Sequence, residues 1–176
     1  MNRRVSMLVR LVWTPRRAPL VYPIPPAPRT AVLSPLFRGT HSVRIFPDGW
    51  TEEAKQFEPQ ALVGSLRQLN ALDGRAAPSH AVIVIRRQLD PGLTDANRDS
   101  LWKAFRVPAF EQVIDEAGVL LATECEAHDG LHIESSRFTG LYEKVQTGPC
   151  ACGRGTPRLV CSPQVDVMRR IAAYAG

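Results

Sequence analysis

Apolar residues recur along the chain with different periods, and these periods predict its regular elements. In residues 59–72 they follow a helical spacing, which predicts an amphipathic helix that stops near Gly74. The apolar positions of this segment are Leu62, Val63, Leu66, Leu69 and Leu72. The next apolar run, residues 81–85, does not alternate with polar residues. Such a run is typical of a strand that is covered on both faces.

The pattern from residue 81 to residue 114 predicts a strand–helix–strand unit. Thr94 is a candidate N-cap for a helix over residues 95–105, which would bury Leu101, Trp102 and Phe105. Residues 107–114 return to a strand-like pattern. Strands joined by a helical crossover pair in parallel, with a right-handed connection. We therefore expect a small parallel sheet in this part of the chain.

Beyond residue 117 the apolar runs become shorter and are separated by turns. They predict four short strands, at residues 118–123, 131–134, 141–146 and 158–161. We expect these strands to form an antiparallel lobe over residues 118–161. A helical pattern over residues 165–174 predicts a final helix.

Residues 1–47 differ in composition from the rest of the chain. They contain eight arginines, eight of the fifteen prolines and no acidic residue. Because proline removes backbone donors and fixes φ, residues 21–34 are expected to be extended. We predict a basic, disordered or loosely docked arm over residues 1–47 and an α/β domain over residues 48–176. The arm's cations suggest nucleic-acid binding by counterion release as an alternative function, although the rest of the chain is net acidic.

Three of the four cysteines and one histidine form a closely spaced pattern, Cys125-x2-His128 followed by Cys150-x-Cys152. Zn²⁺ takes four ligands in a tetrahedron, and thiolates and imidazoles are its usual ligands. We expect these four residues to hold one structural zinc ion. The alternative is reduced thiols and a surface histidine that share no ion. The expected fold is thus α/β, a small mixed sheet with a βαβ unit followed by an antiparallel, zinc-stapled lobe.

Two further residues could replace a proposed ligand. His132 lies four residues beyond His128, and Cys161 lies in an apolar run that is equally typical of a buried thiol. If only three residues held the ion, a zinc-bound water with Glu124 or Glu126 as base would support hydrolysis. Several thiolates place negative charge on the ion and make a bound water less acidic. A closed structural site is therefore favoured.

Three blocks of sequence carry a resemblance to a known family. Residues 101–112 read LWKAFRVPAFEQ, residues 124–132 read ECEAHDGLH, and residues 150–154 read CACGR. They resemble a segment of the phenylacetate-CoA ligase-like branch of the adenylate-forming enzymes, in which a helix and a VPVFEQ-like strand lead into the nucleotide pocket. Some members bind structural zinc with such residues, which implies Cys125, His128, Cys150 and Cys152 as the ligands here. The resemblance covers less than half of the chain.

The sequence departs from that family at the motifs with which the family binds its nucleotide and catalyses its reaction. Residues 113–117 read VIDEA in place of the Tyr-Gly-x-Ser/Thr-Glu motif for adenine and magnesium. We find no Ser/Thr/Gly-rich phosphate loop with its lysine, no ribose-binding aspartate, and no small C-terminal domain with a catalytic lysine. Adenylation needs positioned cations and backbone donors together. We therefore predict a noncatalytic zinc-binding protein, with residual acyl- or aryl-CoA ligase activity or zinc hydrolysis as alternatives.

The cysteine content and the lengths of the apolar runs bear on the cellular compartment of the protein. Four cysteines do not make a disulfide-dense secreted scaffold, and no apolar run has the length of a membrane span. Clustered thiols favour a metal site in a reducing compartment, so we expect a cytoplasmic protein. Its partner is unknown from sequence, and another protein chain is the expected class.

Overall fold

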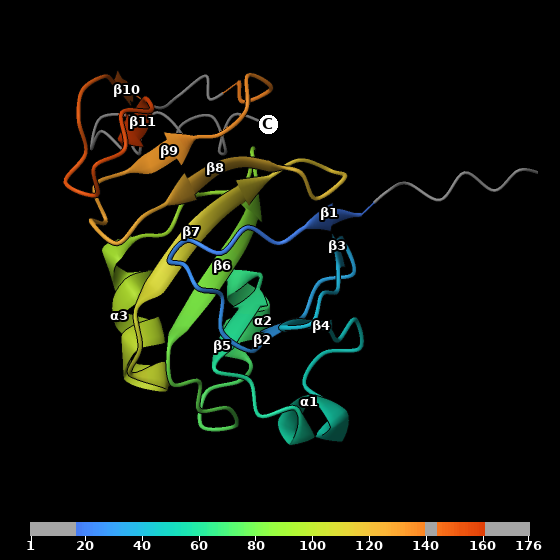
Figure 1. Ribbon diagram of the computed structural model, residues 1–176. Helices are drawn as coiled ribbons and strands as arrows, with labels where there is room; N and C mark the ends of the chain where they lie inside the picture. Colours follow the sequence, from blue (N-terminus) through green and yellow to red (C-terminus); the bar gives the residue numbers. More distant parts are fainter. Residues whose placement is uncertain (1–16, 140–143, 161–176) are drawn as a thin grey trace, which may run out of the picture.

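The computed structural model describes residues 17–139 and 144–160, which form eleven strands and three short helices (Figure 1). Their bounds, in chain order, are β1 Ala18–Pro19, β2 Thr30–Val32, β3 Phe37–Arg38, β4 Val43–Ile45, α1 Glu52–Gln56, β5 Ala61–Gly64, α2 Leu66–Asn70, β6 Ala81–Arg87, α3 Asp95–Phe105, β7 Ala109–Ile114, β8 Leu120–Glu124, β9 Leu131–Ile133, β10 Lys144–Gln146 and β11 Arg158–Val160. No helix among these residues is long and apolar enough to cross a membrane. The predicted final helix and Cys161 lie outside the described residues.

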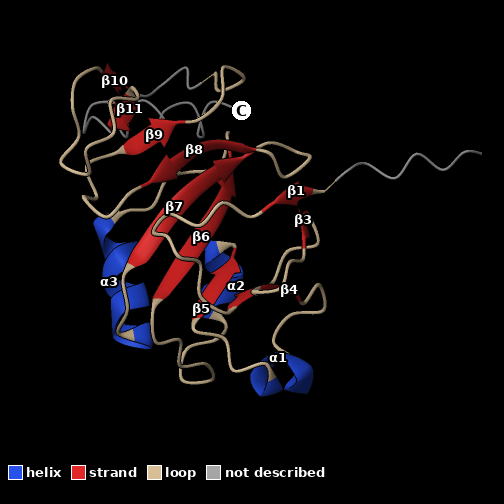
Figure 2. Cartoon of the chain, in the orientation of Figure 1, coloured by secondary structure: helices blue, strands red, loops and turns tan. Residues whose placement is uncertain are grey.

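One sheet of nine strands dominates the fold (Figure 2). Its strand order is β10-β11-β9-β8-β7-β6-β5-β2-β4. The strands from β4 to β7 pair in parallel, whereas β8, β9, β11 and β10 continue the sheet with antiparallel pairing. The α/β class with a mixed sheet is therefore confirmed. The predicted parallel sheet and the antiparallel lobe are two halves of a single sheet.

The strand–helix–strand unit predicted from residue 81 onward is confirmed. Strands β6 and β7 pair in parallel, with Val82 opposite Ala109, and α3 connects them. Thr94 is the N-cap of α3: its side chain accepts a hydrogen bond from the Asn97 N–H, and Asn97 returns the contact in a capping box. Arg106 closes the helix in the left-handed conformation. Trp102, expected in the core, is 52% exposed.

The predicted helix over residues 59–72 is wrong. The segment begins as strand β5, and the helix α2 starts only after Ser65, whose side chain accepts a hydrogen bond from the Gln68 N–H. All four residues of β5 are buried because the strand pairs with β2 on one side and β6 on the other. The apolar spacing that suggested one helix therefore combines a doubly covered strand with a single helical turn.

Residues 18–45, which the sequence analysis assigned to a basic arm, contribute strands β1 to β4. Strand β2 is fully buried between β4 and β5, since Thr30, Ala31 and Val32 form a short run that can be covered on both faces. Residues 1–16 of the predicted arm lie outside the described residues. The expected boundary at residue 48 falls between β4, a strand of the nine-stranded sheet, and α1, whose Ala54 packs in an apolar cluster on that sheet.

Two apolar clusters cover the faces of the parallel half of the sheet. On one face Leu69 of α2 and Leu101 and Phe105 of α3 pack against Leu62 and Val82. On the other face the N-terminal segment provides the cover, through side chains that pack against Val63, Ile83 and Phe110. The covering side chains are Leu20, Tyr22, Ile24 and Leu36. A third, smaller cluster in the antiparallel half includes Val113, Leu131 and Leu159.

Candidate metal centre

The antiparallel half of the sheet brings a group of cysteines and one histidine together. Cys125 follows directly after β8, and His132 lies in the middle of β9. Cys150 and Cys152 belong to the turn that precedes β11. The register places His132 opposite both Thr123 of β8 and Arg158 of β11. Sheet pairing therefore carries residues that are far apart in sequence to one point.

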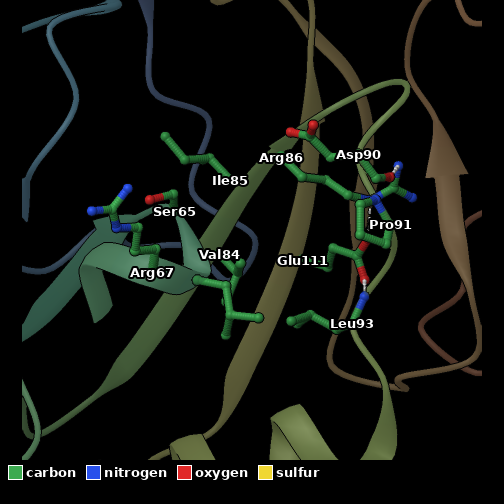
Figure 3. A pocket seen from close by; sticks show the side chains of 10 residues that line it. Ser65, Arg67, Val84, Ile85, Arg86, Asp90, Pro91, Leu93 and Glu111 are labelled. Atoms are coloured by element: carbon green, nitrogen blue, oxygen red, sulfur yellow. Dashed lines mark hydrogen bonds and ion pairs between the residues drawn. The ribbon is translucent and has the colours of Figure 1, made fainter. Parts of the chain in front are cut away.

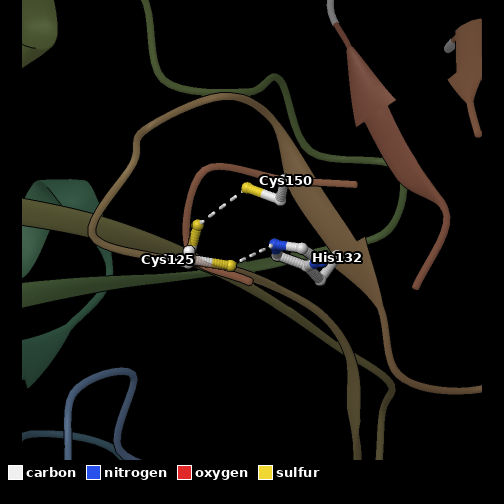
Figure 4. Close-up of side chains that lie close together, drawn as sticks. Cys125, His132 and Cys150 are labelled. Atoms are coloured by element: carbon white, nitrogen blue, oxygen red, sulfur yellow. Dashed lines mark hydrogen bonds between the residues drawn. The ribbon is translucent and has the colours of Figure 1, made fainter. Parts of the chain in front are cut away.

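The ligand atoms of Cys125, His132, Cys150 and Cys152 all lie within 4.8 Å of one another. The Sγ atoms of Cys125 and Cys150 are 3.7 Å apart, and the Sγ of Cys152 lies 3.4 Å from Nε2 of His132 (Figure 4). Cys125 and His132 have no exposed surface, Cys150 is 5% exposed, and Cys152 is half-buried. Three thiols and one imidazole converge as a four-ligand set that could hold one metal ion.

Thr156 orients the imidazole of His132. Its Oγ1 lies 2.7 Å from Nδ1 of the ring, and Nε2 faces the sulfur atoms. A metal-binding histidine usually donates its second ring N–H to a neighbouring oxygen, which fixes both the tautomer and the ring plane. The contact with Thr156 leaves Nε2 as the atom with a free lone pair toward the cluster.

Backbone hydrogen bonds stabilise the turn that carries Cys150 and Cys152. The Cys150 N–H donates to the Arg154 carbonyl at 3.1 Å, and the Gly153 N–H donates to the Cys150 carbonyl at 2.9 Å. Gly153 has a φ of 82°, in the left-handed region that glycine adopts without strain. This closed turn aims both sulfur atoms at the same point.

The surroundings set the protonation of the cluster. Burial raises the pKa of the Cys125 thiol to about 12. Burial also lowers the pKa of His132, and the charge of Arg154 adds to this effect, so the imidazole is held neutral. A backbone hydrogen bond from Arg154 lowers the pKa of Cys152. A neutral imidazole and an acidic thiol are the forms that bind a metal ion most readily.

His128 does not belong to this group of four. Its backbone N–H donates to the Cys125 carbonyl at 3.0 Å, and its φ is 49°. The ring stacks on Phe110 with centroids 5.0 Å apart, and Nδ1 lies 2.9 Å from Oε1 of Glu124. The structure therefore joins Cys125, Cys150 and Cys152 of the predicted ligands with His132, which the sequence analysis had named as an alternative.

Of the two carboxylates considered as a base, Glu124 is buried and accepts several hydrogen bonds, as does its neighbour Glu111. Glu124 receives the Glu111 N–H at 2.8 Å and the Arg98 guanidinium at 3.0 Å, besides the contact with His128. Glu111 pairs with Arg86 and accepts the Leu93 N–H at 3.1 Å. Glu126, by contrast, is exposed. The donors around Glu124 occupy the oxygens that a general base would need.

A cavity of about 210 Å³ lies at the carboxyl ends of β5 and β6, where α/β sheets commonly bind ligands (Figure 3). Ser65 and Arg67 from the start of α2 line it, together with Val84, Arg86 and Glu111. No lysine is found among the described residues that line this cavity. Arg86 and Glu111 pair with each other in its wall, so their charges are largely compensated.

Comparisons with known proteins bear on the fold. No family model matches the chain, and no curated protein matches it. Among solved structures, it is similar to 2-hydroxyisobutyryl-CoA ligase, crystallised in an open conformation with 2-HIB-AMP and CoA. The TM-score is 0.52 at 13% sequence identity, and the match covers 77% of this chain. It covers 44% of the ligase chain, so the fold resembles that of part of an adenylate-forming CoA ligase.

Proposed function

We propose that Cys125, His132, Cys150 and Cys152 bind one structural Zn²⁺ ion in a noncatalytic relative of part of the adenylate-forming ligase fold. The convergence of their four ligand atoms within 4.8 Å carries this proposal. Three thiolates and one imidazole are a usual donor set for tetrahedral zinc in proteins. Harder ions such as Mg²⁺ and Ca²⁺ prefer oxygen ligands, which this cluster does not offer.

Two arginines next to the cluster favour a site that holds a zinc ion. Three thiolates and a neutral imidazole around Zn²⁺ leave one excess negative charge. Arg158 is 2% exposed and donates to the Asp129 carbonyl at 3.0 Å, and the charges of Asp129 and Cys150 raise its pKa. Arg154, on the other side of the turn, lowers the pKa of Cys152, chiefly through its backbone N–H. Each guanidinium group also pairs with a carboxylate, Arg158 with Asp129 and Arg154 with Glu134, so only part of its charge offsets that of a buried zinc–thiolate centre.

The ligand count supports a structural role for the ion. A catalytic zinc keeps a position open for water, whereas four protein ligands close the tetrahedron. Three of the four ligands are buried, so water has little access to the ion. Glu124 is occupied by its contacts with Arg98 and His128. These features favour a structural zinc site over the zinc-hydrolase alternative.

The noncatalytic assignment rests on the sequence at the expected nucleotide pocket. Strand β7 carries the FEQ block, and residues 113–117 continue as VIDEA where the ligases have their adenine and magnesium motif. The likeness to the ligase structure is in the fold. We infer a binding or accessory role for the chain, in the reducing cytoplasm, where such thiolates keep their ion. Its partner would be another protein.

Two matched variants test the ligand set. The wild-type chain, purified and reloaded with zinc, should carry one zinc per chain by elemental analysis. His132→Asn should lose it, and His128→Asn should keep it, because only His132 belongs to the cluster. The opposite pattern would assign the ligand to His128, and a wild-type chain without zinc would refute the metal site. Pyrophosphate release from ATP with aryl or acyl acids should stay at background, and a positive result would overturn the noncatalytic assignment.

A further inference from the structure

Cys152 differs from the other three cluster residues in its accessibility. Cys125 and His132 are fully buried and Cys150 nearly so, whereas Cys152 is half-buried. The residues on either side of it, Ala151 and Gly153, are exposed. A small reagent from solution therefore reaches one sulfur atom of the cluster before the others.

We propose that the cluster is a peroxide-sensitive thiol switch in which Cys152 is oxidised first, Cys125 completes a disulfide with it, and the zinc ion leaves. This inference rests on the proposed zinc site and adds a regulated state to it. It names Cys152 as a modification site and a hydroperoxide as the reagent. Zinc-bound sulfur keeps thiolate character, and thiolates are the form that peroxides oxidise.

The chemistry needs no component beyond the peroxide. The Cys152 thiolate attacks one oxygen of hydrogen peroxide, the O–O bond breaks, and a sulfenic acid forms as hydroxide leaves. The Cys125 thiolate then attacks the sulfenic sulfur, the S–S bond forms, and a second hydroxide leaves. Two thiolates lose two electrons in total, and one peroxide gains them. With both sulfur atoms in the disulfide, only His132 and Cys150 would remain to hold the ion.

Position favours Cys125 as the resolving residue. Its sulfur lies within 4.8 Å of that of Cys152 and comes from a different loop, the one that follows β8. A disulfide between Cys150 and Cys152 would instead have to close within one tight turn, where the Cys150 carbonyl already accepts the Gly153 N–H.

The test follows zinc and disulfides in the same zinc-loaded sample. Equimolar hydrogen peroxide should release the ion, as measured with a chromogenic chelator. Tryptic digestion separates Cys125, in residues 107–137, from Cys150 and Cys152, in residues 145–154. The two peptides should become linked, with fragmentation placing the bond at Cys152. A bond within residues 145–154, or one to the peptide that contains Cys161, would overturn the assignment.

Cys152→His is the matched control because it retains four zinc ligands and removes the accessible thiolate. We expect this variant to bind one zinc and to release it about tenfold more slowly under peroxide. Equal release rates in the variant and the wild type would refute the role of Cys152. A wild-type chain that binds zinc but keeps it under peroxide would refute the switch alone. A chain that binds no zinc would refute the proposed function beneath it.

Discussion

Oγ1 of Thr156 lies 2.7 Å from Nδ1 of His132, and this contact turns the opposite ring nitrogen toward the cysteine cluster. Thr156 follows the turn of Cys150 and Cys152 and precedes β11, whereas His132 lies on β9. The hydroxyl thus joins the two segments that supply three of the four proposed ligands. It acts as the outer oxygen partner that metal-binding histidines usually have.

Thr156→Val removes this hydroxyl with little change of shape. The ring of His132 would lose its fixed orientation and tautomer, so zinc affinity should fall by about tenfold. Competition with a calibrated chelator measures the change. Thr147→Val provides the control, because Thr147 is exposed in the same half of the sheet. Equal affinities for the two variants would show that Thr156 has no part in ligand orientation.

Zinc affinity should rise with pH. In the metal-free protein burial raises the pKa of Cys125 to about 12, so this thiol holds its proton at neutral pH. Zinc must displace that proton, and low pH therefore opposes binding. Each proton released adds about a tenfold gain in affinity per pH unit. The neutral His132, whose pKa burial lowers, releases none.

Chelator competition at pH values of about 6 and about 8 measures this slope. Cys125→Asp places a carboxylate at the same position. Because this carboxylate is already ionised over this range, the variant should release one proton fewer when zinc binds, and its zinc affinity should rise less steeply with pH. An affinity that is independent of pH in the wild-type chain would contradict the protonated state of Cys125.

The cysteines of the candidate site could be predicted from sequence, but the choice of histidine could not. Close spacing in sequence suggested Cys125 and His128 as one pair of ligands. In the structure the two residues between Cys125 and His128 form a turn, in which the His128 N–H donates a hydrogen bond to the Cys125 carbonyl. His132 reaches the cluster through the register of β9 with β8 and β11. Such pairing is non-local, and spacing along the chain contains no information about it.

The fold was predictable where local signals agree with tertiary packing. Thr94 and Asn97 form a capping box that marks the start of α3, and the apolar run of β6 marks a strand covered on both faces. Strand β5 was missed because Leu62 and Val63 also fit the helical spacing of Leu66 and Leu69. Burial between two neighbouring strands decided the conformation there. The same holds for β2, three residues long, within a proline-rich segment.

The buried pair of Arg86 and Glu111 should matter for stability. Their side chains are 6% and 5% exposed. Glu111→Gln removes the carboxylate that pairs with Nε of the buried Arg86, which should cost about 3 kcal/mol in the free energy of unfolding. Urea denaturation measures this loss.

Glu58→Gln is the matched control for that experiment. Glu58 pairs with Arg29 at 3.6 Å, but the two side chains are 76% and 51% exposed. Solvent screens such a pair, so the loss should be under about 1 kcal/mol. Similar losses at Glu111 and Glu58 would show that the buried pair contributes no more than a surface ion pair.

Gly130 should tolerate no side chain, because β11 passes directly against it. Its φ is +81°, and a Cβ at this position would lie 2.4 Å from the Leu159 carbonyl oxygen. Gly74 has a similar φ of +67°, but a Cβ there would meet nothing within 4 Å. The two glycines thus share the same backbone strain on substitution and differ only in the close approach of a neighbouring strand.

Gly130→Ala should therefore lower the free energy of unfolding by about 3 kcal/mol, against about 1 kcal/mol for Gly74→Ala. The displaced backbone belongs to β11, which pairs with β9 at Leu131 and His132. Gly130→Ala should consequently weaken zinc binding as well, whereas Gly74→Ala should leave it unchanged. Urea denaturation and chelator competition on both variants measure the two effects. If Gly130→Ala lowered stability but kept full zinc affinity, the metal site would not depend on the β9–β11 pairing.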